Sequence, residues 1–370
     1  MKIVDYTLHR LHLELPLPIG DSQVRFVDHW MTVLELTANS GLSTDGGPSG
    51  DAGLTGVGFE LQQGKPIAAL SELRAQFEYN AWPMLQHANP FGTALRITRP
   101  RGGNVGAATF PLAVETALWD LMGKSLALPL YQLLGGTNPQ VPVYASTLDF
   151  HLSDDEFRTK LKNFKRMGFD AVKIKVGHPD VDWDLRRMGI AQEVMGRNAD
   201  LMIDANEAWS PKEAIRRAQR YRDEGFDIFW IEDPITREDY AGYAQLAAEI
   251  PFTRMNTGEY LDFSGKRRLL ESHGVDVLNL HGSMGMTRAA AHLAGDFGIP
   301  VSLGNTLLEI GVHLAASLPE CLYMEFSDLP WNRLAKQPVR FENGMALAPD
   351  QPGHGIELNR DVLAQYSRER

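Results

Sequence analysis

The spacing of apolar and polar positions changes twice along the chain. Residues 1–64 alternate with a period of two, as in Lys2–Leu8, which predicts half-buried antiparallel strands. Gly41–Gly53 interrupts them with glycine, serine, aspartate and proline, and we expect a loop there. Pro66–Leu134 then has helical spacing, clearest in Pro111–Asp120. Strands followed by segregated helices predict an α+β domain.

From Val141 onward, short apolar runs alternate with segments of helical pattern. Eight units of this kind predict a (β/α) barrel, whereas an open doubly wound sheet is disfavoured because no glycine-rich turn follows the first strand. The alternation ends after Asp328. We therefore divide the chain into an α+β domain at 1–125, a barrel at 126–330 and a C-terminal segment at 331–370. The C-terminal segment is expected to return to the first domain. The predicted strands are Val141–Ser146, Ala171–Val176, Leu201–Asp204, Ile228–Glu232, Phe252–Glu259, Val275–Leu280, Pro300–Leu303 and Leu322–Phe326.

Composition narrows the class of protein. The 370 residues are 44% hydrophobic and carry a net charge of -11, which excludes a nucleic-acid partner because a phosphate backbone requires a basic surface. No apolar run is long enough to span a membrane. Charges at Asp5, Arg10 and Glu14 interrupt any signal-peptide core, so we expect a cytoplasmic protein without a membrane partner. The single cysteine, Cys321, is expected in the core.

Polar side chains occur where successive predicted strands end. Catalytic groups of barrel enzymes lie at the carboxyl ends of the strands, so an arc of such endings predicts an active site. The second to seventh strands end in ionisable or amide groups after an apolar body, and the eighth adds an acid: Lys173, Lys175, Asp204, Asn206, Glu232, Glu259, His281, Asn305 and Glu325.

Three of these acids stand on adjacent strands. Asp204, Glu232 and Glu259 would repel one another without a cation, and hard carboxylate oxygens suit Mg²⁺, with Mn²⁺ as a substitute. Any one of them alone could be a surface acid, but the set of three predicts a metal site. Asp233, which precedes Pro234, is expected to fix a turn.

Lys173 and Lys175 alternate along one strand and therefore face the same side. A lysine beside a divalent cation has a lowered pKa and can act as a base. This arrangement suits removal of the proton next to a carboxylate, giving an enediolate whose charge the metal stabilises. We assign Lys175 as the base and Lys173 to a carboxylate oxygen, while a protonated Glu325 would donate to the other oxygen.

These motifs resemble the enolase superfamily, in its mandelate racemase/muconate lactonizing enzyme branch. The resemblance is carried by Lys173-x-Lys175, Asp204-x-Asn206, Glu232-Asp233-Pro234, Gly258-Glu259, and the segments Ala113–Lys124 and Pro129–Gly136. It implies an α/β fold, a (β/α)7β modified TIM barrel with an α+β N-terminal capping domain at 1–125. It also implies Mg²⁺, a small carboxylate substrate and a homo-oligomer, often an octamer. Capping loops would be Ile19–Trp30 and Gly41–Gly53.

The residues depart from that branch at the sixth and seventh strands. Glu259 and Glu325 are closest to the mandelate racemase subgroup, which pairs an aspartate after strand six with a histidine after strand seven. Here those positions are His281 and Asn305, and the strand-six lysine of the muconate lactonizing type is missing. The second acid/base group is therefore altered or absent.

One secure base favours elimination over racemisation. We expect a dehydratase of a 2,3-dihydroxy acid, a sugar acid, in which His281 or Lys175 protonates the departing hydroxyl. A racemase or epimerase, or a cycloisomerase, is the alternative; outside this class stand a metal-dependent sugar isomerase and a non-catalytic barrel. The candidate substrate-binding residues are Asn206, Asn305, His29 and Arg25.

Overall fold

A three-stranded antiparallel sheet forms the N-terminal part of the chain. The computed structural model describes residues 1–39, 53–98, 110–304 and 308–369. The strands pair in the order β1-β2-β3. The alternation that predicted them agrees with the structure, since Leu11 and Met31, partners across the first ladder, are both fully buried. The strands are β1 (Lys2–Gly20), β2 (Arg25–Asn39) and β3 (Leu54–Gln63).

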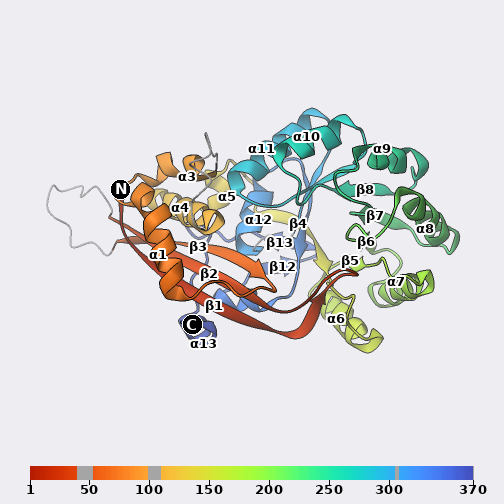
Figure 1. The fold of residues 1–370 in the computed structure, drawn as a ribbon, viewed down its shortest axis with the longest axis horizontal. Helices are drawn as coiled ribbons and strands as arrows, with labels where there is room; N and C mark the ends of the chain where they lie inside the picture. The colour runs from red at the N-terminus through yellow and green to blue at the C-terminus, as the bar shows by residue number, and fades with distance from the viewer. Residues whose placement is uncertain (40–52, 99–109, 305–307, 370) are drawn as a thin grey trace.

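Helix α4 lies directly on this sheet. Its close approach depends on two glycines of β3, because a Cβ atom at Gly56 would stand 2.2 Å from the Ala117 carbonyl oxygen, and one at Gly58 would stand 1.8 Å from that of Ala113. The sheet and its helices form the orange part of Figure 1. The helices are α1 (Leu70–Asn80), α2 (Trp82–Leu85), α3 (Pro90–Thr98), α4 (Pro111–Leu126) and α5 (Leu130–Leu133).

Eight parallel strands form a closed barrel, which confirms the predicted fold. The order runs from β4 through β11 without interruption, and β11 pairs back onto β4. Strand β5 is buried at all five positions, as expected of a barrel strand covered on both faces. The strands are β4 (Gln140–Ser146), β5 (Ala171–Lys175), β6 (Asp200–Asp204), β7 (Ile228–Glu232), β8 (Arg254–Thr257), β9 (Val277–Leu280), β10 (Val301–Leu303) and β11 (Cys321–Phe326).

Helices surround the barrel (Figure 1). The first six begin at a serine or aspartate whose side chain accepts a backbone N–H of the first turn, and Ser153 forms a full capping box with Glu156. These caps fix the loops that follow strands β4 to β9. The helices are α6 (Asp154–Arg166), α7 (Val181–Met195), α8 (Pro211–Asp223), α9 (Tyr240–Glu249), α10 (Phe263–Glu271), α11 (Met284–Asp296) and α12 (Leu308–Ala316).

The last forty residues contact both parts of the molecule. After the short 3₁₀ helix η1 (Pro330–Leu334), β12 (Arg340–Glu342) and β13 (Met345–Leu347) form a hairpin, and β13 pairs antiparallel with β4 of the barrel. Helix α13 (Arg360–Tyr366) then lies against the capping sheet. Arg360 pairs with Glu35 at 2.6 Å, and the Arg368 amide donates to the Arg10 carbonyl at 2.8 Å. Both chain ends therefore lie at the cap (Figure 1). The boundaries at 125 and 330 stay a prediction.

None of the helices in the described ranges combines the length and apolar character that crossing a bilayer requires.

The glycine contact between β3 and α4 can be tested with a matched pair of variants. Gly58→Ala should lower the free energy of unfolding by at least about 2 kcal/mol, because backbone atoms of α4 cannot move aside. Gly92→Ala, where an added Cβ has nothing within 4 Å, should leave stability unchanged or raise it by up to about 1 kcal/mol. Urea unfolding measures both, and equal effects would contradict this packing.

Candidate active site

The structure gathers most of the predicted site residues around one cavity at the barrel mouth. This acid cavity has a volume of about 80 Å³. Lys175, Asp204 and Glu232 are register partners across β5, β6 and β7, so their side chains leave the sheet at one level. The predicted residues that line the cavity are Lys173, Lys175, Asp204, Asn206, Glu232, Glu259 and Glu325.

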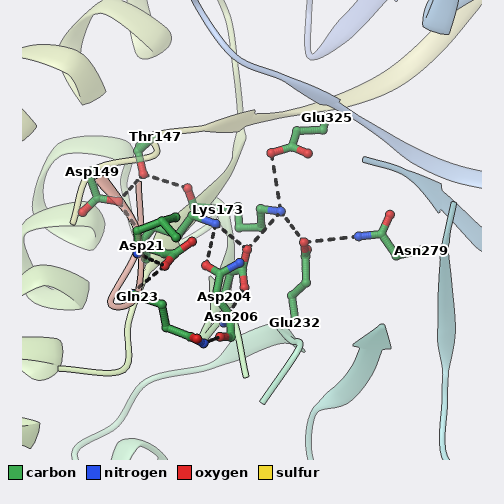
Figure 2. Close-up of polar contacts among 12 residues, drawn as sticks. Asp21, Gln23, Thr147, Asp149, Lys173, Asp204, Asn206, Glu232, Asn279 and Glu325 are labelled. Atoms are coloured by element: carbon green, nitrogen blue, oxygen red, sulfur yellow. Dashed lines mark hydrogen bonds and ion pairs between the residues drawn. The ribbon is translucent and has the colours of Figure 1, made fainter. Parts of the chain in front are cut away.

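Lys173 stands between three of the acids (Figure 2). Its Nζ lies 2.5 Å from Glu232 Oε1, 3.5 Å from Glu325 Oε1 and 3.6 Å from Asp204 Oδ2. The side chain is only 2% exposed. Burial alone would lower the pKa of Lys173, but the surrounding carboxylates, Glu232 first, raise it well above its usual value. Lys173 is therefore a fixed positive charge.

Lys175 is held by the neighbouring strand. Its Nζ lies 2.6 Å from Asp204 Oδ2 and donates to Asn206 Oδ1 at 2.8 Å. Burial lowers the pKa of Lys175, but the Asp204 carboxylate outweighs it, so the pKa is raised. Lys175 was predicted to have a lowered pKa, so that it could act as a base. That lowering would have to come from the positive charge of a bound cation.

The acids carry unbalanced charge. Burial raises the pKa of Glu259 to about 7, with Glu325 adding to the effect, and burial also raises the pKa of Glu232 well above its usual value. For Asp204, the two lysines overcome burial and lower the pKa. Four buried acids and the half-buried Asp21 line the cavity against two lysines, so acidic side chains outnumber basic ones by three.

The donor set fits a divalent cation. Glu232 Oε2 and Glu259 Oε1 are buried and have no hydrogen-bond partner, which is costly for carboxylate oxygens unless a cation contacts them. Within the described ranges, no three acid, histidine or cysteine side chains stand in a ready-made metal-binding arrangement. Three of the acids, Asp204, Glu232 and Glu325, are instead gathered around Lys173 Nζ. Binding of a divalent cation would therefore require the acid side chains to turn toward a common point.

A buried ion pair anchors the strand that carries both lysines. Asp149 Oδ1 accepts the Lys175 backbone N–H at 2.9 Å, and Asp149 Oδ2 lies 2.8 Å from Arg187 Nη2. Thr147 Oγ1 lies 2.5 Å from Asp149 Oδ1 and 2.9 Å from the Lys173 carbonyl oxygen. Asp149 and Arg187 are both fully buried. This network fixes the backbone beneath the lysines, and the sequence pattern did not identify it.

The hairpin tip between β1 and β2 covers one side of the mouth. Gln23 Nε2 donates to the Asn206 carbonyl oxygen, and His151 Nε2 lies 2.9 Å from the Val24 carbonyl oxygen. The predicted capping loop Ile19–Trp30 is largely strand, because β1 reaches Gly20 and β2 begins at Arg25. The tip supplies Asp21 to the cavity wall, and β2 supplies Phe26. Gln63 and Tyr260 also line the cavity and were not among the predicted residues.

Three further predicted residues that the structure describes, His281, Arg25 and His29, do not line the acid cavity. His281 follows β9, with Nδ1 3.3 Å from the Gly304 carbonyl oxygen, and lines a second, larger cavity. Arg25 is exposed on β2 and lines neither cavity. His29 is fully buried beside Phe26 and Trp331, and neither of its ring nitrogens has a partner. Asn305 and the Gly41–Gly53 loop up to residue 52 lie outside the described residues.

A closed eight-stranded barrel with buried acids and lysines at its mouth, covered by an antiparallel sheet, defines a capped α/β-barrel enzyme. Residues 156–362 match the family described as enolase C-terminal domain-like, and residues 50–135 match the N-terminal domain of mandelate racemase/muconate lactonizing enzyme. The chain therefore belongs to the mandelate racemase/muconate lactonizing enzyme family of the enolase superfamily.

Two curated relatives are similar over most of the chain. A 3,6-anhydro-alpha-L-galactonate cycloisomerase of Streptomyces coelicolor is 35% identical over 273 residues, which are 72% of this chain and 74% of the relative. An arabinonate dehydratase of Saccharolobus solfataricus is 28% identical over 268 residues, 68% of this chain and 70% of the relative.

Two solved structures share the whole fold. One is a Mesorhizobium loti protein that is provisionally described as a mandelate racemase. Its structure matches this one with a TM-score of 0.90 and 39% sequence identity, and the match covers 100% of this chain and 95% of that one. A racemase from Streptomyces coelicolor with bound magnesium has a TM-score of 0.81 and 27% identity, covering 99% of this chain and 100% of that one. Structural relatives thus bind Mg²⁺.

The raised pKa of Glu259 predicts a stability profile that Mg²⁺ should change. Because its pKa of about 7 lies above the unfolded value, stability in chelator is present below about pH 4.5 and is lost as pH rises through about 7. Saturating Mg²⁺ should remove this loss, because it favours the ionised acids. Thermal unfolding between pH 5 and 8, with chelator or Mg²⁺, measures the effect.

Glu115 provides the matched control, because burial raises its pKa to about 7 as well, but it lies outside the acid cavity. Glu259→Gln should reduce the slope with pH and also weaken the Mg²⁺ stabilisation. Glu115→Gln should reduce the slope alone. Undiminished Mg²⁺ stabilisation of Glu259→Gln would exclude Glu259 as a ligand.

Proposed function

We propose that this enzyme removes the proton α to the carboxylate of a sugar acid and expels an oxygen substituent from the neighbouring carbon, as a dehydratase of a 2,3-dihydroxy acid does. The observation that carries the proposal is the position of Lys175. Its buried Nζ lies at the wall of the cavity that holds the acids, and it is held by Asp204 and Asn206. A primary amine in this place can reach a proton on a small acid bound there.

Asp204, Glu232 and Glu259 would hold Mg²⁺. When bound, the ion supplies positive charge to the substrate carboxylate and stabilises the negative charge that develops on it. The excess of acidic over basic side chains in the cavity and the unpartnered oxygens of Glu232 and Glu259 support this assignment.

The side chains then have separate tasks. Lys173, held as an ammonium by Glu232 and Glu325, contacts one oxygen of the substrate carboxylate. Lys175 takes the α-proton. The bond to the oxygen on the neighbouring carbon breaks as that oxygen takes up a proton from His281 or from Lys175, and water departs. Tautomerisation of the resulting enol gives a 2-keto acid, so the reaction is balanced without an oxidant or a reductant.

Elimination is favoured over racemisation because Lys175 is the one base assigned to a face of the α-carbon. Racemisation requires a second acid/base group on the opposite face, where the sequence offers His281 and Asn305 in place of an aspartate–histidine pair. The similarity to an arabinonate dehydratase supports a sugar acid as substrate.

A cycloisomerase is the second candidate, favoured by the 35% identity to the relative of that activity. In a cyclic sugar acid with an ether oxygen on the β-carbon, the same proton removal would open the ring. The departing oxygen then stays in the product, and no water is released. The two candidates thus share the tasks of Lys173 and Lys175 and differ in the bond that breaks.

Exchange of the α-proton in D₂O tests the base. Wild-type enzyme with Mg²⁺, incubated with a panel of open-chain and cyclic sugar acids, should incorporate deuterium or form a 2-keto product, both visible by NMR. Lys175→Met should reduce either rate by at least about a thousandfold, because no other group replaces the base. Lys162→Met, an exposed lysine of α6, should behave as wild type.

The products separate the candidates. A 2-keto product from a dihydroxy acid supports dehydration, and ring opening without loss of water supports the cycloisomerase. Exchange with inversion and no keto product would exclude elimination. Unchanged exchange in Lys175→Met would remove the base assignment.

A further inference from the structure

A second cavity adjoins the acid cavity beneath the cap. It has a volume of about 530 Å³, against about 80 Å³ for the acid cavity. Phe26, Gln63 and Tyr260 line both, so the two cavities are direct neighbours. The acid cavity is lined by charged groups that would surround a carboxylate and its neighbouring carbon. The rest of any larger substrate must extend into the second cavity.

Most of the wall of this second cavity, which we call the apolar cavity, is hydrocarbon or aromatic. It is built where β3 and α4 of the cap face α11, α12 and η1. Because these side chains come from both parts of the molecule, the cavity belongs to the closed arrangement of cap and barrel. The side chains that matter here are Phe59, Leu61, Leu112, Met284, Leu314 and Trp331.

The charged groups of the apolar cavity disfavour an anion. Glu115 is 1% exposed, and its two carboxylate oxygens accept the backbone N–H groups of Met284 and Gly285, each at 3.0 Å. Among the described residues that line the cavity, the lysine is Lys65, whose side chain is exposed, the histidine is the half-buried His281, and none is an arginine. A second carboxylate placed here would lose water and stand near Glu115, and no lysine or arginine among these described residues is buried beside it.

We propose that the apolar cavity receives the distal part of the substrate, and that this substrate is a monocarboxylic acid with an apolar or ring-closed distal part rather than a dicarboxylic acid. The proposal rests on the proposed function, because the carboxylate end is placed in the acid cavity. Apolar surface gains free energy on transfer to such a wall, whereas an unpaired carboxylate loses it. Among sugar acids, a cyclic ether with fewer hydroxyl groups suits this cavity better than an open-chain diacid.

Binding of two matched analogues tests the proposal without turnover. Both are 2-hydroxy acids of equal length in which a methyl group replaces the α-hydrogen, one ending in a phenyl ring and the other in a carboxylate. Isothermal titration with Mg²⁺ present should give a dissociation constant at least about tenfold lower for the phenyl analogue. Tighter or equal binding of the diacid would overturn the proposal, whatever the variants do.

A charge introduced into the wall should reverse this preference. Leu61→Arg, at a half-buried position of β3 in the cavity wall, should bind the diacid more tightly and the phenyl analogue more weakly. Val27→Arg, on an exposed position of β2 that lines neither cavity, should leave both dissociation constants unchanged. Equal effects of the two variants would show that the added positive charge changes binding of the analogues wherever it is placed. That result would count against the apolar cavity as the binding site.

Failure of the apolar-cavity proposal can be distinguished from failure of the proposed function. If no acid exchanges its α-proton or forms a 2-keto product with wild type, the proposed function fails. If either occurs, but open-chain diacids react with a higher kcat/KM than cyclic or alkyl monoacids, the function stands and the apolar-cavity proposal fails.

Discussion

Buried charge at the barrel mouth is the constraint on which the rest of the site depends. Asp204, Glu232, Glu259 and Glu325 are withdrawn from water on four strands or strand ends, and Lys173 and Lys175 are the basic side chains that oppose them among the described residues lining the cavity. Such a set is costly to hold in a low-dielectric interior, and two carboxylate oxygens remain unpartnered. A folded protein tolerates this cost where a ligand offsets it. A bound cation would therefore complete the site. The two lysines differ in their surroundings, because three acids enclose Lys173 whereas Lys175 contacts one acid, Asp204, and the amide of Asn206.

The rigid surroundings of the two lysines follow from the same constraint. A lysine that must stand beside Asp204 and still reach a substrate proton needs a fixed backbone, and the buried Arg187–Asp149 pair supplies it through the Lys175 amide. The helix caps of α10 and α11 have the same effect, since they fix the loops on which Glu259 and His281 lie. The contacts proposed for the distal part of the substrate, by contrast, come from β2 and β3 of the cap, which carry Phe26 and Leu61.

The barrel and the strand-end residues could be predicted because both follow from periodicity. Parallel strands place their carboxyl ends on one edge, so Lys175, Asp204 and Glu232 had to converge once the strands were recognised. Contacts between distant segments could not be predicted in this way. Gln23 meets the Asn206 carbonyl across 183 residues, and Gln63 reaches the cavity only because β3 packs on α4. His281 shows the same limit within the barrel, since the sequence placed it at a strand end but could not orient its ring toward Gly304 and the larger cavity.

The return of the chain to the cap has a consequence for how the protein is made. The capping sheet is synthesised first, but one of its contacts, through Arg360 and the residues after α13, is synthesised last. The barrel between them can close as soon as β11 reaches β4, whereas this contact of the cap forms only after α13 has been synthesised. A chain that stops before α13 could therefore form the barrel while leaving the cap without this contact.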